Sequence, residues 1–189
     1  MPQRILIGIT GSIVTVGIHN YLMEIQKFYS CEINIILSNA ASKLITPQSL
    51  SYFIDGEIFN DSFQNSKKYK IPHVHLAEWA DLILIMPATA NIIGKLANGI
   101  ADDLISLTLL AAECPVVICP NMNGKMYSKN SVQRNVNQLK DDGYMIMESN
   151  DVVFQLSNSK NVKGTMPRPE NFVTHLERMI NDATNNYKS

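Results

Sequence analysis

Short runs of apolar residues alternate along the chain with segments in which apolar residues recur every three or four positions. A run that is apolar on both faces is typical of a strand in a parallel sheet that helices cover on both sides. The most continuous run is LILIM at residues 82–86, and we expect it to form the central strand. Pro87 should end this strand, because proline has no N–H to donate to the ladder. The same reasoning predicts further strands at residues 4–9, 33–37, 116–119 and 144–147.

After most of these runs, apolar residues recur every three or four positions, which predicts a helix. Residues 12–28 are predicted to form the first helix, with Ser12 as its N-cap. Residues 92–110 should form two helices that meet at a turn, Asn98-Gly99. Strands that alternate with helices predict an α/β fold, a single-domain doubly wound parallel sheet of the Rossmann or flavodoxin-like kind. The remaining helices are predicted at residues 47–53, 128–139 and 169–180.

Polar segments mark the predicted limits of the domain. Residues 1–182 are expected to form one domain of ordinary size. Residues 55–72 lack a sustained period, and we interpret them as a surface excursion. Residues 148–166 are a second polar segment, and residues 183–189 are predicted to be a frayed tail.

Composition narrows the choice of partners. The chain has 189 residues, a formal net charge of −1 and 46% hydrophobic residues, which favours neither nucleic acid nor an anionic membrane. No apolar run approaches the roughly 20 residues of a membrane-spanning helix, and the first residues lack a plausible signal-peptide cleavage site, so we expect a cytoplasmic protein. The three cysteines are an odd number without metal-ligand spacing, and His73 and His75 lack a supporting ligand, so no metal is predicted.

Small and polar residues follow several predicted strands, where ligands bind in open α/β sheets. Thr10-Gly11-Ser12 leads into a helix whose free N–H groups suit a phosphate, and Ser38 would face the same anion. An ordinary capped turn is the alternative for this segment. The shared edge would collect hydroxyls, amides, methionines and one imidazole with few charges. This inventory suits a flat, uncharged ring system with a phosphate tail.

Three segments of the chain together resemble motifs of the flavin-containing cysteine decarboxylases. HVHLAEWADLILIMPATANIIGKLANGIADDL, residues 73–104, is similar to their histidine-containing and PASANT motifs. PNMNGKMY, residues 120–127, resembles their PxMNxxMW motif, and GITGSI, residues 8–13, resembles their FMN-phosphate turn. The resemblance implies FMN as cofactor and a homo-oligomer, either a trimer or a dodecamer of four trimers, with the flavin near a subunit interface.

Carried over by position, the resemblance assigns His73 and Asn123 to catalysis. His73 stands fourteen residues before Pro87, as the family's active-site histidine stands before its motif proline. Asn123 would hold the carboxylate of the substrate, and Met126 would shape the pocket around it. The implied FMN contacts are Gly11, Ser12, Ile13 and Ser38 at the phosphate, with Thr89, Ala90, Asn91, Ile92, Asn121 and Met122 elsewhere on the cofactor.

The match to the family motifs has three departures. Tyr127 stands where the family usually has tryptophan, and it keeps an aromatic ring. Thr89 replaces a serine and keeps the hydroxyl group. Ile92 stands in place of the last threonine of PASANT.

The late part of the chain separates the two branches of the family. The coenzyme A branch carries a cysteine there, within an ACG segment, but residues 152–166 contain none. FQLSNSKNVKGTMP, residues 154–167, instead resembles the peptide-binding clamp of the lantibiotic enzymes of the epidermin and mersacidin type. The resemblance implies that residues 148–166 are a substrate clamp loop, which we name the clamp segment. This resemblance implies that Thr165, Met166 and Pro167 bind the substrate, which would be the C-terminal cysteine of a precursor peptide.

The predicted reaction follows from the chemistry of such a substrate. A carboxylate next to an unactivated carbon does not leave readily, because the carbanion has nowhere to place its charge. Hydride transfer from the carbon that bears sulfur to the flavin gives a thioaldehyde, whose C=S group accepts electrons as CO₂ leaves. His73 would deprotonate the thiol or steer its proton. We therefore predict FMN-dependent oxidative decarboxylation of the C-terminal cysteine of a lantibiotic-type precursor peptide to an aminoenethiol.

Rival functions share the fold or the cofactor. One is a phosphopantothenoylcysteine decarboxylase of coenzyme A synthesis with unusual proton delivery. Another is a non-catalytic FMN-binding regulatory subunit, against which the presence of His73 and Asn123 argues. A prenylated-flavin-forming prenyltransferase is similar in fold but lacks the segment seen here at residues 120–127.

Overall fold

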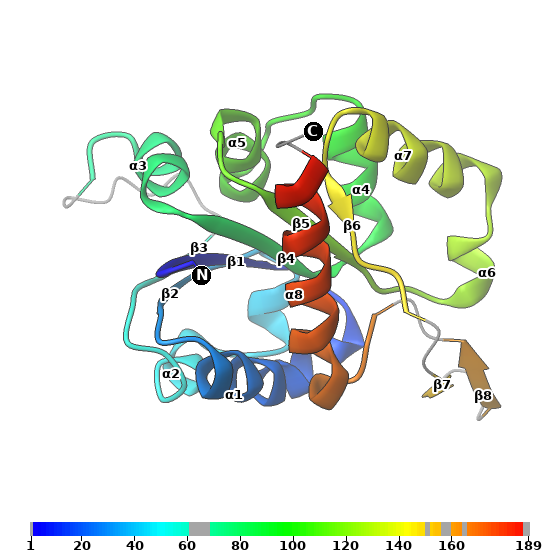
Figure 1. The fold of residues 1–189 in the computed structure, drawn as a ribbon, viewed down its shortest axis with the longest axis horizontal. Helices are drawn as coiled ribbons and strands as arrows, with labels where there is room; N and C mark the ends of the chain where they lie inside the picture. Colours follow the sequence, from blue (N-terminus) through cyan, green and yellow to red (C-terminus); the bar gives the residue numbers. More distant parts are fainter. Residues whose placement is uncertain (1, 61–68, 150–151, 156–159, 164–165, 187–189) are drawn as a thin grey trace.

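The computed structural model describes residues 2–60, 69–149, 152–155, 160–163 and 166–186. The described residues form a six-stranded sheet in the order β3-β2-β1-β4-β5-β6, in which every pair of neighbours is parallel (Figure 1). The predicted doubly wound α/β fold is therefore confirmed. The chain winds outward in opposite directions from β1 and β4, so the switch point of the sheet lies between these two strands. The strands are β1 Arg4–Ile9, β2 Glu32–Leu37, β3 Ile58–Asn60, β4 Leu82–Ala88, β5 Val116–Pro120 and β6 Met145–Ile146.

Helices cover both faces of this sheet. Buried side chains of α1 and α8 pack on one face, and those of α3, α4, α5 and α7 pack on the other. The two-faced burial explains why the strands read as continuous apolar runs. Each fully buried leucine or isoleucine contributes about 1.5–3 kcal/mol to folding. The helical elements are η1 Ile13–Gly17, α1 Ile18–Phe28, η2 Ala41–Lys43, α2 Pro47–Leu50, α3 Pro72–Trp79, α4 Ala90–Ala97, α5 Leu104–Ala111, α6 Gly124–Tyr127, α7 Asn130–Asp141 and α8 Pro169–Asn186.

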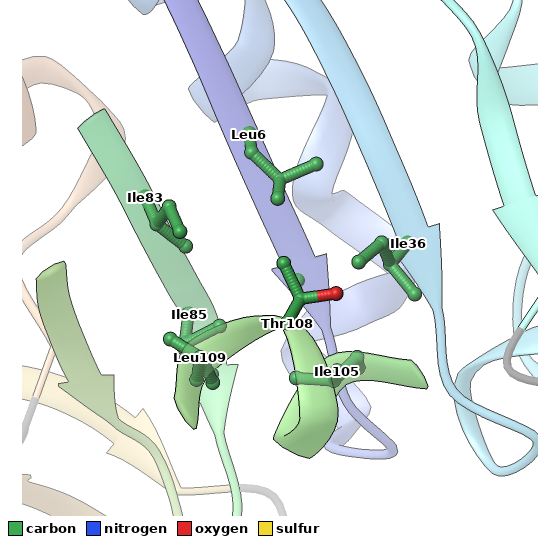
Figure 2. A pocket seen from close by; sticks show the side chains of 8 residues that line it. Leu6, Ile36, Ile83, Ile85, Ile105, Thr108 and Leu109 are labelled. Carbon is green, nitrogen blue, oxygen red and sulfur yellow. The ribbon is translucent and has the colours of Figure 1, made fainter. Parts of the chain in front are cut away.

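Helix α5 packs against the sheet with almost no space beneath it. Figure 2 shows its side chains facing those of β1, β2 and β4, and the remaining gap among them is too small for a water molecule. An added Cβ atom at Gly8 would lie 2.6 Å from Cδ1 of Ile85 and 3.3 Å from Cγ2 of Ile105. Gly8 is therefore required for helix packing, and this apolar gap is not a ligand site.

A small antiparallel hairpin follows β6. It pairs β7, Val152–Gln155, with β8, Lys160–Lys163, and it lies in the segment that resembles the substrate clamp. In Figure 1 the hairpin and α6 are both drawn at the right of the molecule. None of the described helices is long and apolar enough to cross a membrane.

The structure differs from the sequence predictions at four places. Strand β4 continues through Pro87 to Ala88, because an irregularity in its register lets Ala88 pair with Pro120. The Met86–Pro87 peptide bond is cis. The segment predicted as a surface excursion contains β3 at the sheet edge, while residues 61–68 lie outside the described part. Helix α8 extends to Asn186, because neither proline nor glycine interrupts it.

The fourth difference concerns the first helix. Its opening turn is the 3-10 helix η1, and the side chain of Ser12 makes no capping hydrogen bond to it. The Ser12 hydroxyl instead donates to Oδ1 of Asn121, at 2.6 Å. The Ser12 side chain thus bonds to the residue that follows β5, two strands away from β1 in the sheet. The predicted turn between α4 and α5 is confirmed, with Gly99 at a φ of 64°.

Candidate active site

Hydrogen bonds join the carboxyl ends of the three central strands. After β1, the hydroxyl of Thr10 donates to the carbonyl of Pro87 in β4, at 2.7 Å. After β5, the backbone N–H of Asn121 donates to the carbonyl of Ala88, at 2.8 Å. The bond between Ser12 and Asn121 closes this network. The loops that sequence reasoning assigned to one edge are therefore brought together.

Two helices begin at this edge without a side-chain cap. Ser12 precedes η1 and Thr89 precedes α4, and neither side chain accepts a hydrogen bond from the first turn of its helix. The first N–H groups of a helix have no partner within the helix. These N–H groups and the positive end of the helix dipole suit an anion or a polar ring edge.

The loop after β2 lies against the turn after β1. An added Cβ atom at Gly11 would lie 2.5 Å from Cβ of Ala40, so only glycine permits this approach. The hydroxyl oxygen of Ser38 accepts from the backbone N–H of Ala41, at 3.1 Å. Ser38 therefore lies in the loop that contacts Gly11, as the sequence predicts. Its hydroxyl proton is not used in that bond.

Asn123 begins the short helix α6 after β5. Its Oδ1 atom accepts from the backbone N–H of Lys125, at 2.9 Å, which fixes the orientation of the amide group. Met126 is 49% exposed and offers apolar surface on the same helix. This pair can present an amide N–H₂ group and a thioether to a small carboxylic acid.

The last residue of α6 is tied to the start of the clamp segment. The Tyr127 hydroxyl donates to Oε1 of Glu148, and Nζ of Lys140 lies 3.7 Å from the same carboxylate. Burial and the neighbouring Glu148 carboxylate raise the pKa of Tyr127 above its usual value. Tryptophan, the usual family residue at this position, has no hydroxyl for this bond.

His73 lies on α3, which packs against α5. Figure 1 places α3 and α6 at opposite ends of the molecule, so His73 is far from Asn123 within one chain. The neighbouring His75 is stacked on Tyr69, with ring centroids 4.1 Å apart. The expected pocket with an imidazole beside the amides is therefore not formed by a single chain, because α3 and α6 lie at opposite ends of the molecule (Figure 1).

Several predicted contact residues are core residues in this structure. Met166 is 3% exposed and packs with the core beneath α1 and α8. Pro167 is also buried, and its carbonyl accepts from the Tyr21 hydroxyl, at 2.9 Å. These two residues anchor the end of the clamp segment and do not expose side chains to a peptide. Thr165 lies outside the described residues.

The remaining predicted flavin contacts differ in exposure. Ile92 is 3% exposed and packs in the core, so only its backbone can face a cofactor. Ile13 is 60% exposed. Asn91 is exposed, while Ala90 and Met122 are half-buried.

The thiols do not provide an alternative nucleophile. Burial raises the pKa of Cys31, Cys114 and Cys119, which keeps all three protonated near neutral pH. No group of three metal-ligating side chains gathers anywhere in the described part of the chain. Sequence reasoning placed Thr10 in the phosphate turn without a role of its own, and it missed Glu148. The only sequence signal for Thr10 is its position beside the glycine turn. No sequence pattern marks Glu148.

The strand order defines a doubly wound α/β protein, and polar residues line the carboxyl edge at its switch point, where such sheets bind ligands. The Flavoprotein family matches residues 1–181, so the chain belongs to this family. Mersacidin decarboxylase from Bacillus sp. is 40% identical over 146 residues, which are 77% of this chain and 73% of the relative. Epidermin decarboxylase from Staphylococcus epidermidis is 30% identical over 191 residues, 100% of this chain and 98% of the relative.

A second group of relatives is longer than this chain. The coenzyme A biosynthesis bifunctional protein CoaBC from Bacillus subtilis is 40% identical over 152 residues. The match spans 80% of this chain but 37% of that protein.

Solved structures share the fold over nearly the whole chain. MrsD from Bacillus sp. aligns with a TM-score of 0.79 and 35% identity, covering 94% of this chain and 95% of that one. The FMN-dependent cysteine decarboxylase SpaF aligns with a TM-score of 0.77 and 35% identity, covering 94% and 97%. A histidine-to-asparagine variant of EpiD in complex with the substrate peptide DSYTC aligns with a TM-score of 0.79 and 30% identity, covering 93% and 98%.

Proposed function

We propose that this chain is an FMN-dependent peptidyl-cysteine decarboxylase. It oxidatively decarboxylates the C-terminal cysteine of a lantibiotic-type precursor peptide to an aminoenethiol. The observation that carries the proposal is the similarity, over almost the entire chain, to an enzyme captured with a substrate peptide that ends in cysteine. The polar edge of the sheet supplies the matching chemistry.

The residues of that edge fit FMN by their chemical character. The uncapped N–H groups of η1 and the hydroxyl group of Ser38 suit the phosphate, while the proton of the Ser12 hydroxyl is donated to Asn121. The start of α4, with Thr89, Ala90 and Asn91, suits the polar edge of the ring. When bound, FMN supplies a hydride acceptor for oxidation of the substrate. The chain itself binds, orients and handles protons.

The substrate contacts follow from the two ends of the cysteine residue. Asn123 donates from its amide nitrogen to the terminal carboxylate, and Met126 provides apolar surface to the carbon and sulfur atoms. His73 takes the thiol proton as the general base. Loss of CO₂ from the oxidised cysteine then leaves the enethiol.

The separation of His73 from Asn123 supports a homo-oligomer in which the two residues come from different copies of the chain. Figure 1 draws α3 and α6 at opposite ends, while one cysteine residue needs both side chains within a few ångströms. We propose a trimer, or a dodecamer of four trimers. Analytical ultracentrifugation distinguishes these two assemblies from a monomer.

A complementation experiment tests whether the site is shared. His73→Asn and Asn123→Asp chains are each expected to be inactive alone. Oligomers assembled from both regain activity, because some interfaces pair an intact His73 with an intact Asn123. Mixed oligomers of verified composition that stay inactive would rule out the shared site.

Mass spectrometry tests the reaction itself. A synthetic peptide ending in cysteine, incubated with the FMN-loaded protein, should lose CO₂ together with two hydrogen atoms. The same peptide with an amidated C-terminus, or with serine as its last residue, should stay unchanged. Loss of CO₂ alone would refute oxidative decarboxylation.

The alternative function is decarboxylation of phosphopantothenoylcysteine, which the similarity to CoaBC favours. Residues 152–166 contain no cysteine, whereas the coenzyme A branch of the family carries one in this part of the chain. This difference argues against phosphopantothenoylcysteine as the substrate. Phosphopantothenoylcysteine in the same assay decides between the two substrates. Turnover of this compound in preference to the peptide would replace our proposal with the alternative.

A further inference from the structure

Thr10 follows β1 directly at the switch point of the sheet, and it is 4% exposed. Its hydroxyl donates to the carbonyl of Pro87, at 2.7 Å, and accepts from the backbone N–H of Thr89, at 3.0 Å. The hydroxyl oxygens of Thr10 and Thr89 lie 3.3 Å apart. Since a carbonyl can only accept, the single hydroxyl proton of Thr10 points to Pro87, and Thr89 donates its own proton to Thr10. The hydroxyl therefore has its full set of one donated and two accepted bonds.

The backbone carbonyl of Thr10 is equally occupied. It accepts from the backbone N–H of Ser12, at 2.8 Å, and from the hydroxyl of Thr15, at 2.7 Å. One residue thus fixes the turn after β1 through its backbone and the loop after β4 through its side chain. These are the two segments to which we assign the FMN phosphate and the FMN ring.

The bond to Thr10 also sets the orientation of the Thr89 hydroxyl. Thr89 occupies the N-cap position of α4, where threonine normally accepts a hydrogen bond from the first turn. Here the side chain makes no capping bond, and its hydroxyl is directed to Thr10. The N–H groups at the start of α4 are consequently left for a ligand.

We propose that Thr10 is a positioning residue for FMN, which sets the spacing between the two cofactor loops and keeps Thr89 from capping α4. The inference rests on the proposed function, because it assumes that FMN lies on these loops. Thr10 itself need not touch the cofactor. Its removal should free Thr89 to cap α4 and compete with FMN for the same N–H groups.

The test compares three variants by FMN titration and by the visible circular dichroism of the bound flavin. Thr10→Val keeps the shape but leaves the Pro87 carbonyl and the Thr89 N–H unpaired, and should weaken FMN binding about tenfold to a hundredfold. Thr10→Ser keeps the hydroxyl and should bind within about threefold of the wild type. Thr108→Val is the matched control, because this buried hydroxyl only donates to the Leu104 carbonyl within α5, at 2.7 Å.

The expected result is weaker binding and an altered flavin dichroism in Thr10→Val, with Thr10→Ser and Thr108→Val unchanged in both. If Thr10→Val binds FMN as tightly as the wild type, or if Thr108→Val loses as much affinity, Thr10 is only a core residue and the inference is wrong. Should Thr10→Val not fold, Thr10→Cys replaces it, since a thiol is a weak donor and acceptor. Equal binding by Thr10→Cys and Thr10→Ser would then overturn the inference. A wild-type chain that binds no FMN would refute the proposed function as well.

Discussion

Helices α4 and α5 follow each other in the chain and contact each other, but they begin in opposite ways. Helix α5 begins at Asp103, whose Oδ1 accepts from the backbone N–H of Ser106, at 2.8 Å, and the Ser106 side chain completes a capping box. Helix α4 begins at Thr89 without any side-chain cap. The N–H groups at the start of α5 are capped by the protein's own side chains, whereas those at the start of α4, at the carboxyl edge, have no side-chain cap.

The two helix starts also differ in their charged groups. Nζ of Lys95 lies 2.6 Å from the carboxylates of both Asp102 and Asp103 at the turn between the helices. Burial opposes ionisation of Asp103, but its hydrogen bonds from Lys95 and Ser106 outweigh this and hold its pKa below the usual value. The network around Thr10 contains only neutral groups. The compensated charges around Asp103 stabilise the fold, and we propose that the neutral network around Thr10 prepares the site.

The largest predicted effect is a loss of turnover when Asn123, at the proposed substrate site, is replaced. Asn123→Asp keeps an oxygen that can accept from the Lys125 N–H but replaces the amide donor with a negative charge. We expect turnover of a cysteine-ending peptide to fall at least about 100-fold, as happens when one key donor is lost. FMN affinity and the free energy of unfolding should change little. Steady-state kinetics measured by mass spectrometry would contradict the assignment if turnover were retained.

Asp103 tests the structural side. Asp103→Ala removes the cap and the partly buried ion pair, so the free energy of unfolding should fall by about 2 kcal/mol. Asp102→Ala is the matched control, because its side chain is 60% exposed against 16% for Asp103, and it should cost less than about 1 kcal/mol. Urea unfolding measures both variants. Neither variant should alter FMN affinity. A large loss of FMN affinity in Asp103→Ala would show that the start of α5 also serves the cofactor, which contradicts our assignment.

The pH dependence of the free energy of unfolding tests whether the charge of Asp103 stabilises the start of α5. Because the pKa of Asp103 is lower in the folded chain than its unfolded value of about 3.9, its contribution is present above that value and is lost as the pH falls through the folded pKa. The unfolding free energies of the flavin-free wild type and Asp103→Asn should therefore differ most near neutral pH and converge in acid. Urea titrations between neutral and acidic pH measure this difference. A difference that does not depend on pH would mean that the carboxylate charge is not the stabilising feature.

The smallest predicted effect concerns the link between α6 and the clamp segment. Tyr127→Phe removes the hydroxyl that donates to Glu148, whose carboxylate is 45% exposed. A loss of about 1 kcal/mol should appear as a roughly fivefold higher KM for the peptide, with FMN affinity unchanged. Tyr127→Trp, which restores the usual family residue, should behave like Tyr127→Phe. A wild-type KM in both variants would show that this hydrogen bond does not order the clamp.

The fold was largely predictable from the sequence, for a physical reason. Strands buried on both faces leave continuous apolar runs; β1, β4 and β5 carry such runs, and β2 carries one that only Asn34 interrupts. Strand β3 has only three residues at the sheet edge, and Ile58 and Phe59 are half-buried, so no two-faced pattern marks it. The extension of β4 through Pro87 depends on pairing with β5, which local sequence does not encode.

The site was predictable only in part. The small and polar residues after the strands mark the carboxyl edge, and the structure brings Ser12 and Asn121 together there. The role of Thr10 depends on partners 77 and 79 residues away, which no local pattern reveals. The burial of Met166 likewise results from packing against α1 and α8. Motif resemblance located these segments, whereas the side-chain contacts required the three-dimensional arrangement.

Anaerobic mixing of the FMN-loaded protein with a peptide that ends in cysteine tests oxidative decarboxylation by this chain. We predict that the visible flavin absorbance bleaches as CO₂ is released, with equal amounts of flavin reduced and CO₂ formed. The amidated peptide should produce neither change. Release of CO₂ from the cysteine peptide while the flavin stays oxidised would contradict oxidative decarboxylation by this chain.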